Sequence, residues 1–344
     1  MQNKINTNQI DSYGPIEGLI LLGGGTLLRK LCLWAKSEGM PVRVITSPRH
    51  NCETVDDESL SDFFLRHKVE NISTDNISSK DVIKFLRNTK DYFYLSLGAA
   101  WIFKESVIKS LFGNRLINLH GTRLPQNRGG GGFSWQILMG NKFGYCALHC
   151  VDGGIDTGEI IAFDEFLYPA NFRKPIDFES YYLDKNLHFL INFIKTYRSD
   201  NLSLNPIRQS EHFSSYWPRL NTEINSWINW ALEANDIERF ICAFDDPYSG
   251  AQTLLNGNKV KIKDICLSPQ DGSFHPFQSG IIYRKSKSWI CVALKGSTLV
   301  VEGLFDEQGQ DILNSVNVGD RFTTPFSLLE SSFGRPIYNS KGLK

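Results

Sequence analysis

Residues 116–156 bring together side chains that could carry out acyl transfer. An apolar run from Leu116 contains Asn118 and ends on His120. Residues two apart point to the same face of a β-strand, so we expect an amide and an imidazole side by side near the end of a strand. Further on, Asp156 lies between glycines. Each feature alone also fits a turn, a cap or a flexible connector. Together they supply an amide donor, a base that titrates near neutrality and a carboxylate to orient it.

The order of these residues resembles the signature of folate-dependent formyltransferases. The pattern is Asn118-x-His120, then Leu124-Pro125-x-x-Arg128-Gly129, then Asp156-Thr157-Gly158. The separation of His120 and Asp156, 156 − 120 = 36 residues, also suits that family. Methionyl-tRNA, phosphoribosylglycinamide and sugar N-formyltransferases share this pattern. The resemblance implies transfer of a formyl group from 10-formyltetrahydrofolate to a primary amine, and no metal is expected.

The resemblance also implies roles for individual residues. His120 would be the general base, Asp156 would hold its imidazole in one tautomer, and Asn118 would donate to the developing oxyanion. Around the folate we expect Gly98, Trp101, Ile102, Val151 and Asp152. The loop that begins at Gly98 fits a strand–helix turn with a core tryptophan as well, and the two interpretations are compatible. His149 is expected to be structural, next to the site.

Departures from the methionyl-tRNA enzymes predict the acceptor. Arg123 stands where a leucine is usual, residues 130–132 are all glycine in place of a bulkier run, and Trp135 follows as in several sugar enzymes. The predicted substrate-binding residues are Arg123, Arg128, Trp217 and Arg219. Trp217 fits packing at a domain junction equally well. We therefore expect a nucleotide-linked amino sugar, a precursor of surface polysaccharide, as acceptor. The alternatives are methionyl-tRNA, or a folate-binding or hydrolytic relative.

The charge balance argues against a nucleic-acid partner. Among 344 residues, 37 Lys and Arg are matched by 37 Asp and Glu, so no net charge attracts a polyanion. Between residues 197 and 225 the charges also cancel: Arg198, Arg208 and Arg219 against Asp200, Glu211 and Glu223. A nucleotide sugar needs less, namely one or two cations for its phosphates and an aromatic surface for its base.

Cysteine usage and hydropathy predict a cytoplasmic protein. The seven cysteines are scattered and never spaced as CxxC, which favours reduced thiols over a disulfide framework. Cys146, His149 and Cys150 lack a fourth ligand, so buried strand side chains are favoured over a zinc site. No apolar run approaches the roughly 20 residues of a membrane-spanning helix. Residues 1–12 show no targeting pattern. The sequence leaves open whether the protein forms a homodimer.

The elements that must position the site form a Rossmann-like sheet. A strand at 16–22, a glycine turn, a helix at 26–39 and a strand at 42–46 predict a β-α-β unit with parallel strands. The pattern Gly23-x-Gly25-x-x-Leu28 lacks the third glycine of a dinucleotide fingerprint. Such a turn can still receive an anion. Further helices are predicted at 57–67, 78–88, 104–112 and 175–198, and further strands at 92–97, 143–151 and 160–166.

A smaller unit follows a polar, irregular stretch at 201–216. A helix at 235–244, the turn Asp245-Asp246-Pro247-Tyr248-Ser249-Gly250-Ala251 and five short strands resemble the C-terminal domain of several formyltransferases, a small OB-like open barrel. The strands are predicted at 252–255, 259–265, 280–283, 288–293 and 298–304. We therefore predict an α/β catalytic domain at 1–215, an OB-like β domain at 216–330 and a tail at 331–344.

Overall fold

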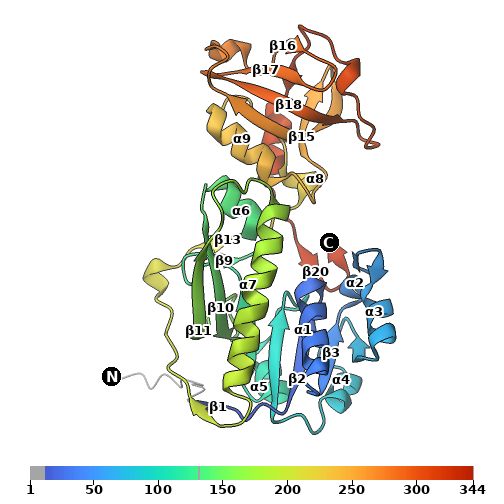
Figure 1. Ribbon diagram of the computed structural model, residues 1–344, viewed down its shortest axis with the longest axis vertical. Helices are drawn as coiled ribbons and strands as arrows, with labels where there is room; N and C mark the ends of the chain where they lie inside the picture. The colour runs from blue at the N-terminus through green and yellow to red at the C-terminus, as the bar shows by residue number, and fades with distance from the viewer. Residues whose placement is uncertain (1–11, 131, 344) are drawn as a thin grey trace.

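A seven-stranded sheet is the centre of the larger of two domains, here the α/β domain (Figure 1). The computed structural model of the chain describes residues 12–130 and 132–343. In spatial order the strands are β11 (Ile160–Leu167), β10 (Phe143–Cys150), β8 (Leu116–His120), β7 (Tyr92–Leu97), β2 (Gly18–Gly23), β3 (Val42–Thr46) and β6 (Glu70–Ser73). Strands β8 to β6 run parallel, whereas β10 is antiparallel to both neighbours. The predicted parallel-rich α/β fold is confirmed.

Helices cover both faces of this sheet because its central strands are apolar on both sides. Leu19 and Leu21 of β2 pack with α1 (Gly25–Ser37), α3 (Leu60–His67) and α7 (Pro175–Thr196). Ile20 and Leu22 face the other way, toward α4 (Lys80–Phe85) and α5 (Glu105–Phe112). Continuous apolar runs of this kind are typical of parallel strands buried between two helical layers.

Two predicted helices begin later than expected because serine caps set their first turns. The helix predicted from Asp57 begins at Leu60, after a short hairpin of β4 (Thr54–Val55) and β5 (Glu58–Ser59). Ser59 Oγ accepts from the Asp62 N–H at 3.1 Å. In the helix predicted from residue 78, Ser79 Oγ accepts from the Val82 N–H at 3.3 Å, and α4 therefore begins at Lys80. An N-cap oxygen satisfies an otherwise unpaired amide of the first turn.

The stretch predicted as an irregular linker is paired to the α/β domain. Strand β12 (Leu202–Ser203) pairs with β1 (Ser12–Tyr13). Strand β13 (Tyr216–Trp217) lies parallel to β9 (Arg128–Gly129). Most of residues 201–216 is irregular, as predicted. The short pairings with distant segments were not predicted, because they leave no local pattern in a sequence.

The smaller domain, here the β domain, is built on a six-stranded antiparallel sheet that curls around α9 (Ala234–Ala243). Its strands in spatial order are β16 (Ile282–Lys285), β17 (Ile290–Leu294), β18 (Ser297–Phe305), β15 (Asn258–Ser268), β14 (Ala251–Leu255) and β19 (Phe322–Thr323). This domain lies at one end of the long axis of the molecule (Figure 1). The predicted helix and five strands are present, and β19 adds a sixth.

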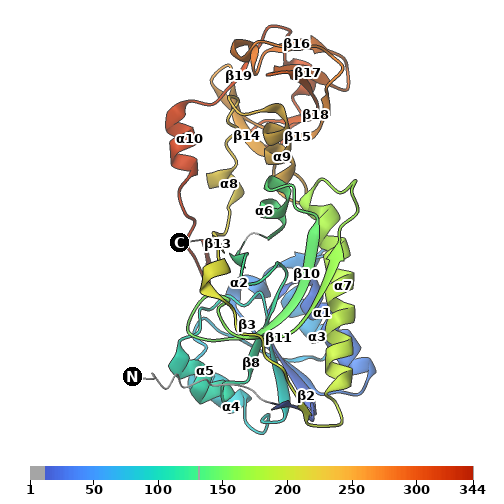
Figure 2. The same ribbon diagram turned by 90° about the vertical axis from the view of Figure 1, so that its left-hand side faces the viewer.

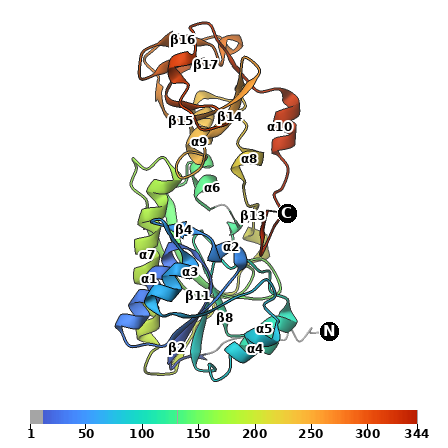
Figure 3. The ribbon, with the colours of Figure 1, turned by 90° about the vertical axis from the view of Figure 1, so that its right-hand side faces the viewer.

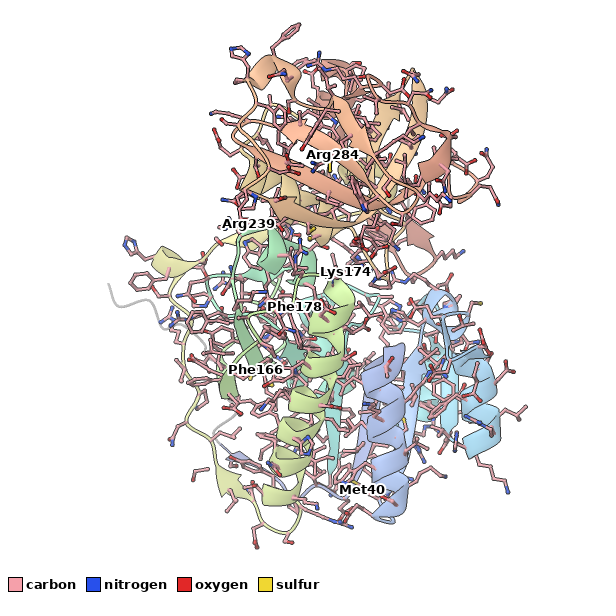
Figure 4. All side chains as sticks on the ribbon, turned by 45° about the horizontal axis from the view of Figure 1, so that its top comes forward. Met40, Phe166, Lys174, Phe178, Arg239 and Arg284 are labelled. Atoms are coloured by element: carbon pink, nitrogen blue, oxygen red, sulfur yellow. The ribbon has the colours of Figure 1, made fainter. Side chains whose placement is uncertain are left out.

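Lys174, the residue before α7, ties the two domains together (Figure 4). Its Nζ lies 3.2 Å from the buried Asp245 and 3.5 Å from Asp246, and it also contacts Asp264. These three carboxylates are spaced so that they could hold a metal ion. Lys174 and Lys263 already offset two of these three negative charges. We therefore interpret the cluster as an interdomain ion-pair network.

Phe178 fills the apolar layer under this network. Its ring is fully buried in a cluster that combines Ile137 and Tyr168 of the α/β domain with Ala243 and Phe244 of the β domain. Figure 4 shows Phe178 and Lys174 at the end of α7 that meets the β domain. Among the described helices, none is both long enough and apolar enough to cross a membrane.

Phe178→Ala should lower the free energy of unfolding by about 3–5 kcal/mol, because it leaves a cavity at the domain junction. Ile176→Ala is the matched control, since Ile176 lies on the same helix with 45% of its surface exposed. It should change stability by no more than about 0.5 kcal/mol. Urea denaturation followed by circular dichroism would measure both variants, and equal midpoints would contradict the role of Phe178.

Candidate active site

The end of β8 places Asn118 and His120 on one face of the sheet. Strand β10 lies beside β8 in an antiparallel register that sets His149 opposite Asn118 and Ala147 opposite His120. Asn118 Nδ2 donates to His149 Nε2 at 3.0 Å, since His149 Nδ1–H donates to the carbonyl of Cys150 at 2.9 Å. His149, 2% exposed, therefore fixes the orientation of the Asn118 amide.

Asp156 lies between these three side chains, on the loop that follows β10. Its Oδ1 is 3.5 Å from Asn118 Nδ2 and 3.4 Å from His149 Nε2. Its Oδ2 accepts from the Gly129 N–H at 2.9 Å and lies 3.6 Å from His120 Nδ1. The structure thus brings together all three predicted catalytic residues and adds His149 and the backbone amide of Gly129.

The hydrogen bonds of His120 assign its tautomer. Nε2 is 2.7 Å from the carbonyl oxygen of Asn127, which can only accept, so Nε2 carries the proton of the neutral ring. Thr122 Oγ lies 2.8 Å from both of these atoms and supports the contact. Nδ1 is then an unprotonated nitrogen directed toward Asp156. A proton taken up at Nδ1 would be stabilised by that carboxylate.

Burial and charge set the protonation states that a base and its partner need. Burial lowers the pKa of His120 below 6.5, against the opposing effect of the Asp156 charge. Burial alone would raise the pKa of Asp156. Its contacts with His149 and His120 and the hydrogen bond from the Gly129 amide instead lower the pKa of Asp156 to about 2. At neutral pH the site therefore contains a neutral imidazole and an ionised carboxylate.

Gln209 holds the Asp156 loop in place and was missed by the sequence analysis. Its Nε2 donates to the carbonyls of Asp156 and Gly158, at 2.9 and 2.6 Å. Its Oε1 accepts from Arg128 Nε at 3.1 Å. These bonds keep Asp156 at φ +53°, a conformation that is costly for a residue with a side chain. No sequence signal identifies a glutamine 53 residues away.

The predicted substrate residues lie in three different settings. Arg128 is buried and bound by Gln209 and by Glu211, 2.8 Å from its Nη1, so it supports the loop. Arg123 is exposed, with its guanidinium 5.9 Å from the centre of the Tyr145 ring. Trp217 pairs with Gly129 in the β13–β9 contact. Arg219 is exposed beside the glycine run, of which Gly131 lies outside the described residues.

A cavity of about 280 Å³ opens at the carboxyl ends of β7 and β8, where ligands of open α/β sheets bind. Asn118, His120 and Asp156 line one side of it. The other predicted pocket residues also line it: Gly98, Trp101, Ile102, Val151 and Asp152. The indole Nε1 of Trp101 is buried with no hydrogen-bond partner among the described residues. This unpaired donor suits a ligand that carries hydrogen-bond acceptors.

Two family models match the chain. The model described as "Formyl transferase" matches residues 19–167, which include the whole Asn118–His120–Asp156 constellation. The model described as "Formyl transferase, C-terminal domain" matches residues 222–317. Residues 318–344 lie beyond both matches.

Sequence relatives carry two kinds of names. The methionyl-tRNA formyltransferase of Clostridium tetani is 28% identical over 224 residues, 65% of this chain and 69% of that protein. The bifunctional polymyxin resistance protein ArnA of Wigglesworthia glossinidia brevipalpis is 27% identical over 250 residues, 70% of this chain and 36% of that protein.

Solved structures share the fold. WlaRD, described as a sugar 3N-formyl transferase in the presence of dTDP and 5-N-formyl-THF, has a TM-score of 0.62 and 21% identity over 83% of this chain and 97% of its own. The N-formyltransferase from Helicobacter canadensis, in complex with folinic acid and dTDP-3-aminofucose, has a TM-score of 0.61 and 21% identity over 83% and 99%. At this identity the likeness shows the common fold.

The pKa of His120 can be predicted and measured in the absence of substrate. An NMR titration of the imidazole should give a pKa below 6.5, because burial disfavours the charged ring. Asp156→Asn should lower this pKa further, because it removes the negative charge that favours the protonated ring. Glu302→Gln, an exposed change in the β domain, is the control and should leave it unchanged. An unchanged or higher pKa in Asp156→Asn would show that the two groups are not coupled.

Proposed function

Because the chain belongs to the formyl transferase family, with both its N-terminal and its C-terminal domain, we propose that it formylates the primary amine of a nucleotide-linked amino sugar. The donor in this proposal is 10-formyltetrahydrofolate. The observation that carries the chemistry is the convergence of Asn118, His120 and Asp156 on one wall of the cavity. We propose the same three as the catalytic residues.

The base in this reaction is His120. A neutral amine attacks the formyl carbon and must lose a proton, which the unprotonated Nδ1 of His120 accepts. The resulting imidazolium lies 3.6 Å from the Asp156 carboxylate, which stabilises its charge. The bond between the formyl carbon and the folate nitrogen then breaks, and this nitrogen receives the proton from His120, so that tetrahydrofolate leaves and the base is restored. A base buried enough to be neutral at pH 7, beside an ionised partner, is ready for this step without prior deprotonation.

Asn118 provides the electrostatic part of the reaction. One N–H of its amide is bound to His149, and the second faces Asp156 at 3.5 Å, a long contact. The oxygen of the formyl group gains negative charge during attack and can take over this second N–H. A fixed donor of this kind is worth roughly 3–4 kcal/mol in the transition state.

The donor side of the proposal is supported by the cavity wall. When bound, the folate supplies an activated formyl group on a good leaving nitrogen. Gly98, Trp101, Ile102, Val151 and Asp152 would hold it, with the unpaired Trp101 Nε1 as a donor for a polar ring system. WlaRD and the Helicobacter canadensis enzyme, by their descriptions, bind reduced formyl folates.

The sugar acceptor is supported by charge and by the solved structures. Both of those structures are described with dTDP or a dTDP-sugar. The 37 cations of this chain are balanced by 37 anions, which does not favour a long contact with tRNA. Methionyl-tRNA is the second candidate, because the Clostridium tetani relative carries that name. The acceptor assay below separates the two.

Variants of the three proposed catalytic residues should stay folded and lose turnover. His120→Ala should lower kcat by roughly 10²–10⁴, the usual effect of removing an acid–base group. Asn118→Ala and Asp156→Asn should fall in a similar range. His188→Ala, an exposed histidine on α7, is the matched control and should stay within twofold of the unaltered protein. If His120→Ala kept a tenth of the activity at saturating substrate, another group would be the base.

The acceptor is tested by comparing the two candidate substrates under the same conditions. With 10-formyltetrahydrofolate as donor and physiological salt, amino sugars linked to UDP, dTDP, GDP or CMP should be formylated, whereas charged initiator tRNA should not. Mass spectrometry would detect the formylated sugar, and acid gels would detect formyl-methionyl-tRNA. Efficient formylation of the tRNA would identify methionyl-tRNA, and not a nucleotide sugar, as the acceptor. Release of formate without transfer would indicate a hydrolytic relative.

A further inference from the structure

The C-terminal segment leaves the β domain and returns to the α/β domain. After α10 (Phe326–Ser332) the chain runs back and ends in a hairpin of β20 (Tyr338–Asn339) and β21 (Gly342–Leu343). Figures 2 and 3 show this path along α8 (Thr222–Asn225) toward α2 (Pro48–Asn51). The carbonyl of Ser340 accepts from the Arg49 N–H at 3.4 Å. This hairpin lies outside both family-model matches.

Two arginines meet at this hairpin, and an aromatic ring orients each of them. The guanidinium of Arg219 lies over the Tyr338 ring, 4.3 Å from its centre, and the Tyr338 hydroxyl accepts from Asn221 Nδ2 at 3.0 Å. Arg49 Nη2 donates to Nε2 of the buried His50 at 2.8 Å. Both guanidinium groups are therefore held before any ligand arrives.

The positive charge of this pair is poorly compensated. Glu53 is the nearest carboxylate, 3.8 Å from Arg49 Nε, which is too long for a hydrogen bond. Within the described part of the chain, no carboxylate lies within 4 Å of Arg219. Burial, with the charges of both arginines, lowers the pKa of His50 to about 4, so His50 stays a neutral acceptor. Two cations that share one carboxylate keep a net positive charge, which favours an anionic ligand.

Arg219 contacts the residue that follows Gly129, a residue of the catalytic cavity wall. A side chain at Gly130 would place its Cβ 3.1 Å from Arg219 Cβ, so the absence of a side chain there lets the two segments touch. Gly129, the preceding residue, lines the cavity and donates to Asp156. Arg219 also borders an interdomain cavity of about 420 Å³ whose walls include Trp135 and Trp227. An anion between Arg49 and Arg219 would therefore lie between the reacting centre and an aromatic cavity.

We propose that Arg49 and Arg219 bind the phosphate groups of the acceptor, and that Tyr338 of the C-terminal hairpin is a positioning residue for Arg219. This inference rests on the proposed function, because a nucleotide-linked sugar brings the phosphates. Planar guanidinium groups suit phosphate oxygens, which accept two parallel hydrogen bonds. The hairpin thus completes a binding site that the two family domains leave unfinished.

Calorimetry with inorganic pyrophosphate, UDP and dTDP tests this site in the full-length protein. Arg49→Gln and Arg219→Gln should each weaken binding by about 10- to 100-fold, the range for a charge-assisted hydrogen bond. Tyr338→Ala should raise the KM of the nucleotide sugar about 10-fold and change kcat much less, since it acts through Arg219. Tyr338→Phe keeps the ring and should restore most of the affinity. Arg87→Gln, an exposed arginine after α4, is the matched control.

The outcomes separate this proposal from the proposed function. Unchanged pyrophosphate and nucleotide binding in both arginine variants would overturn the site, while sugar formylation could still stand. Absence of binding in the unaltered protein would overturn it too. If both arginine variants lost pyrophosphate binding and the unaltered protein formylated no nucleotide sugar, the anion site would be confirmed and the nucleotide sugar would be rejected as acceptor. Affinity for 5-formyltetrahydrofolate should stay constant throughout and reports that each variant is folded.

Discussion

The Asp156 carboxylate is the contact on which the site depends. It receives the amide of Gly129, faces His120 on one side, and faces Asn118 and His149 on the other. A buried carboxylate is costly unless its lone pairs are satisfied, and here donors from two strands and a loop meet that requirement. In return, the carboxylate fixes the distances between those donors. The strand ends, the glycine run and the loop after β10 therefore keep one arrangement.

The fold supplies this arrangement by making β10 antiparallel at the edge of a parallel sheet. Strand β10 ends beside Ile117, near the start of β8, and the loop that follows it carries Asp156 back to Asn118 and His120. The antiparallel register brings His149 beside Asn118, and the chain then turns directly into the Asp156 loop. Gly158 allows this turn, since a Cβ there would lie 1.9 Å from the carbonyl oxygen of Cys150. Arg128 and Gln209 fasten the loop from outside the sheet.

Local patterns in the sequence predicted the parts of the fold that obey local rules. The bounds of β7 followed from its apolar run, and the shared face of Asn118 and His120 followed from the two-residue period of a strand. The role of Gln209 and the β13–β9 pairing depend on contacts between segments far apart in the chain, which leave no periodic signal. Arg128 shows the same limit. Its charge and its place in the signature predicted a substrate-binding residue, whereas its side chain is directed toward Gln209 and Glu211.

The return of the chain from the β domain also has a mechanical consequence. On one side the β domain is attached by two adjacent segments, because Asn225 donates to the carbonyls of Ser332 and Gly334. On the other side Lys174 fastens it to α7. Between these two places, the buried cluster around Phe178 joins the α/β domain to the β domain. The aromatic cavity between the domains is thus framed on several sides by fixed contacts, and its walls keep their position relative to the sheet that carries His120.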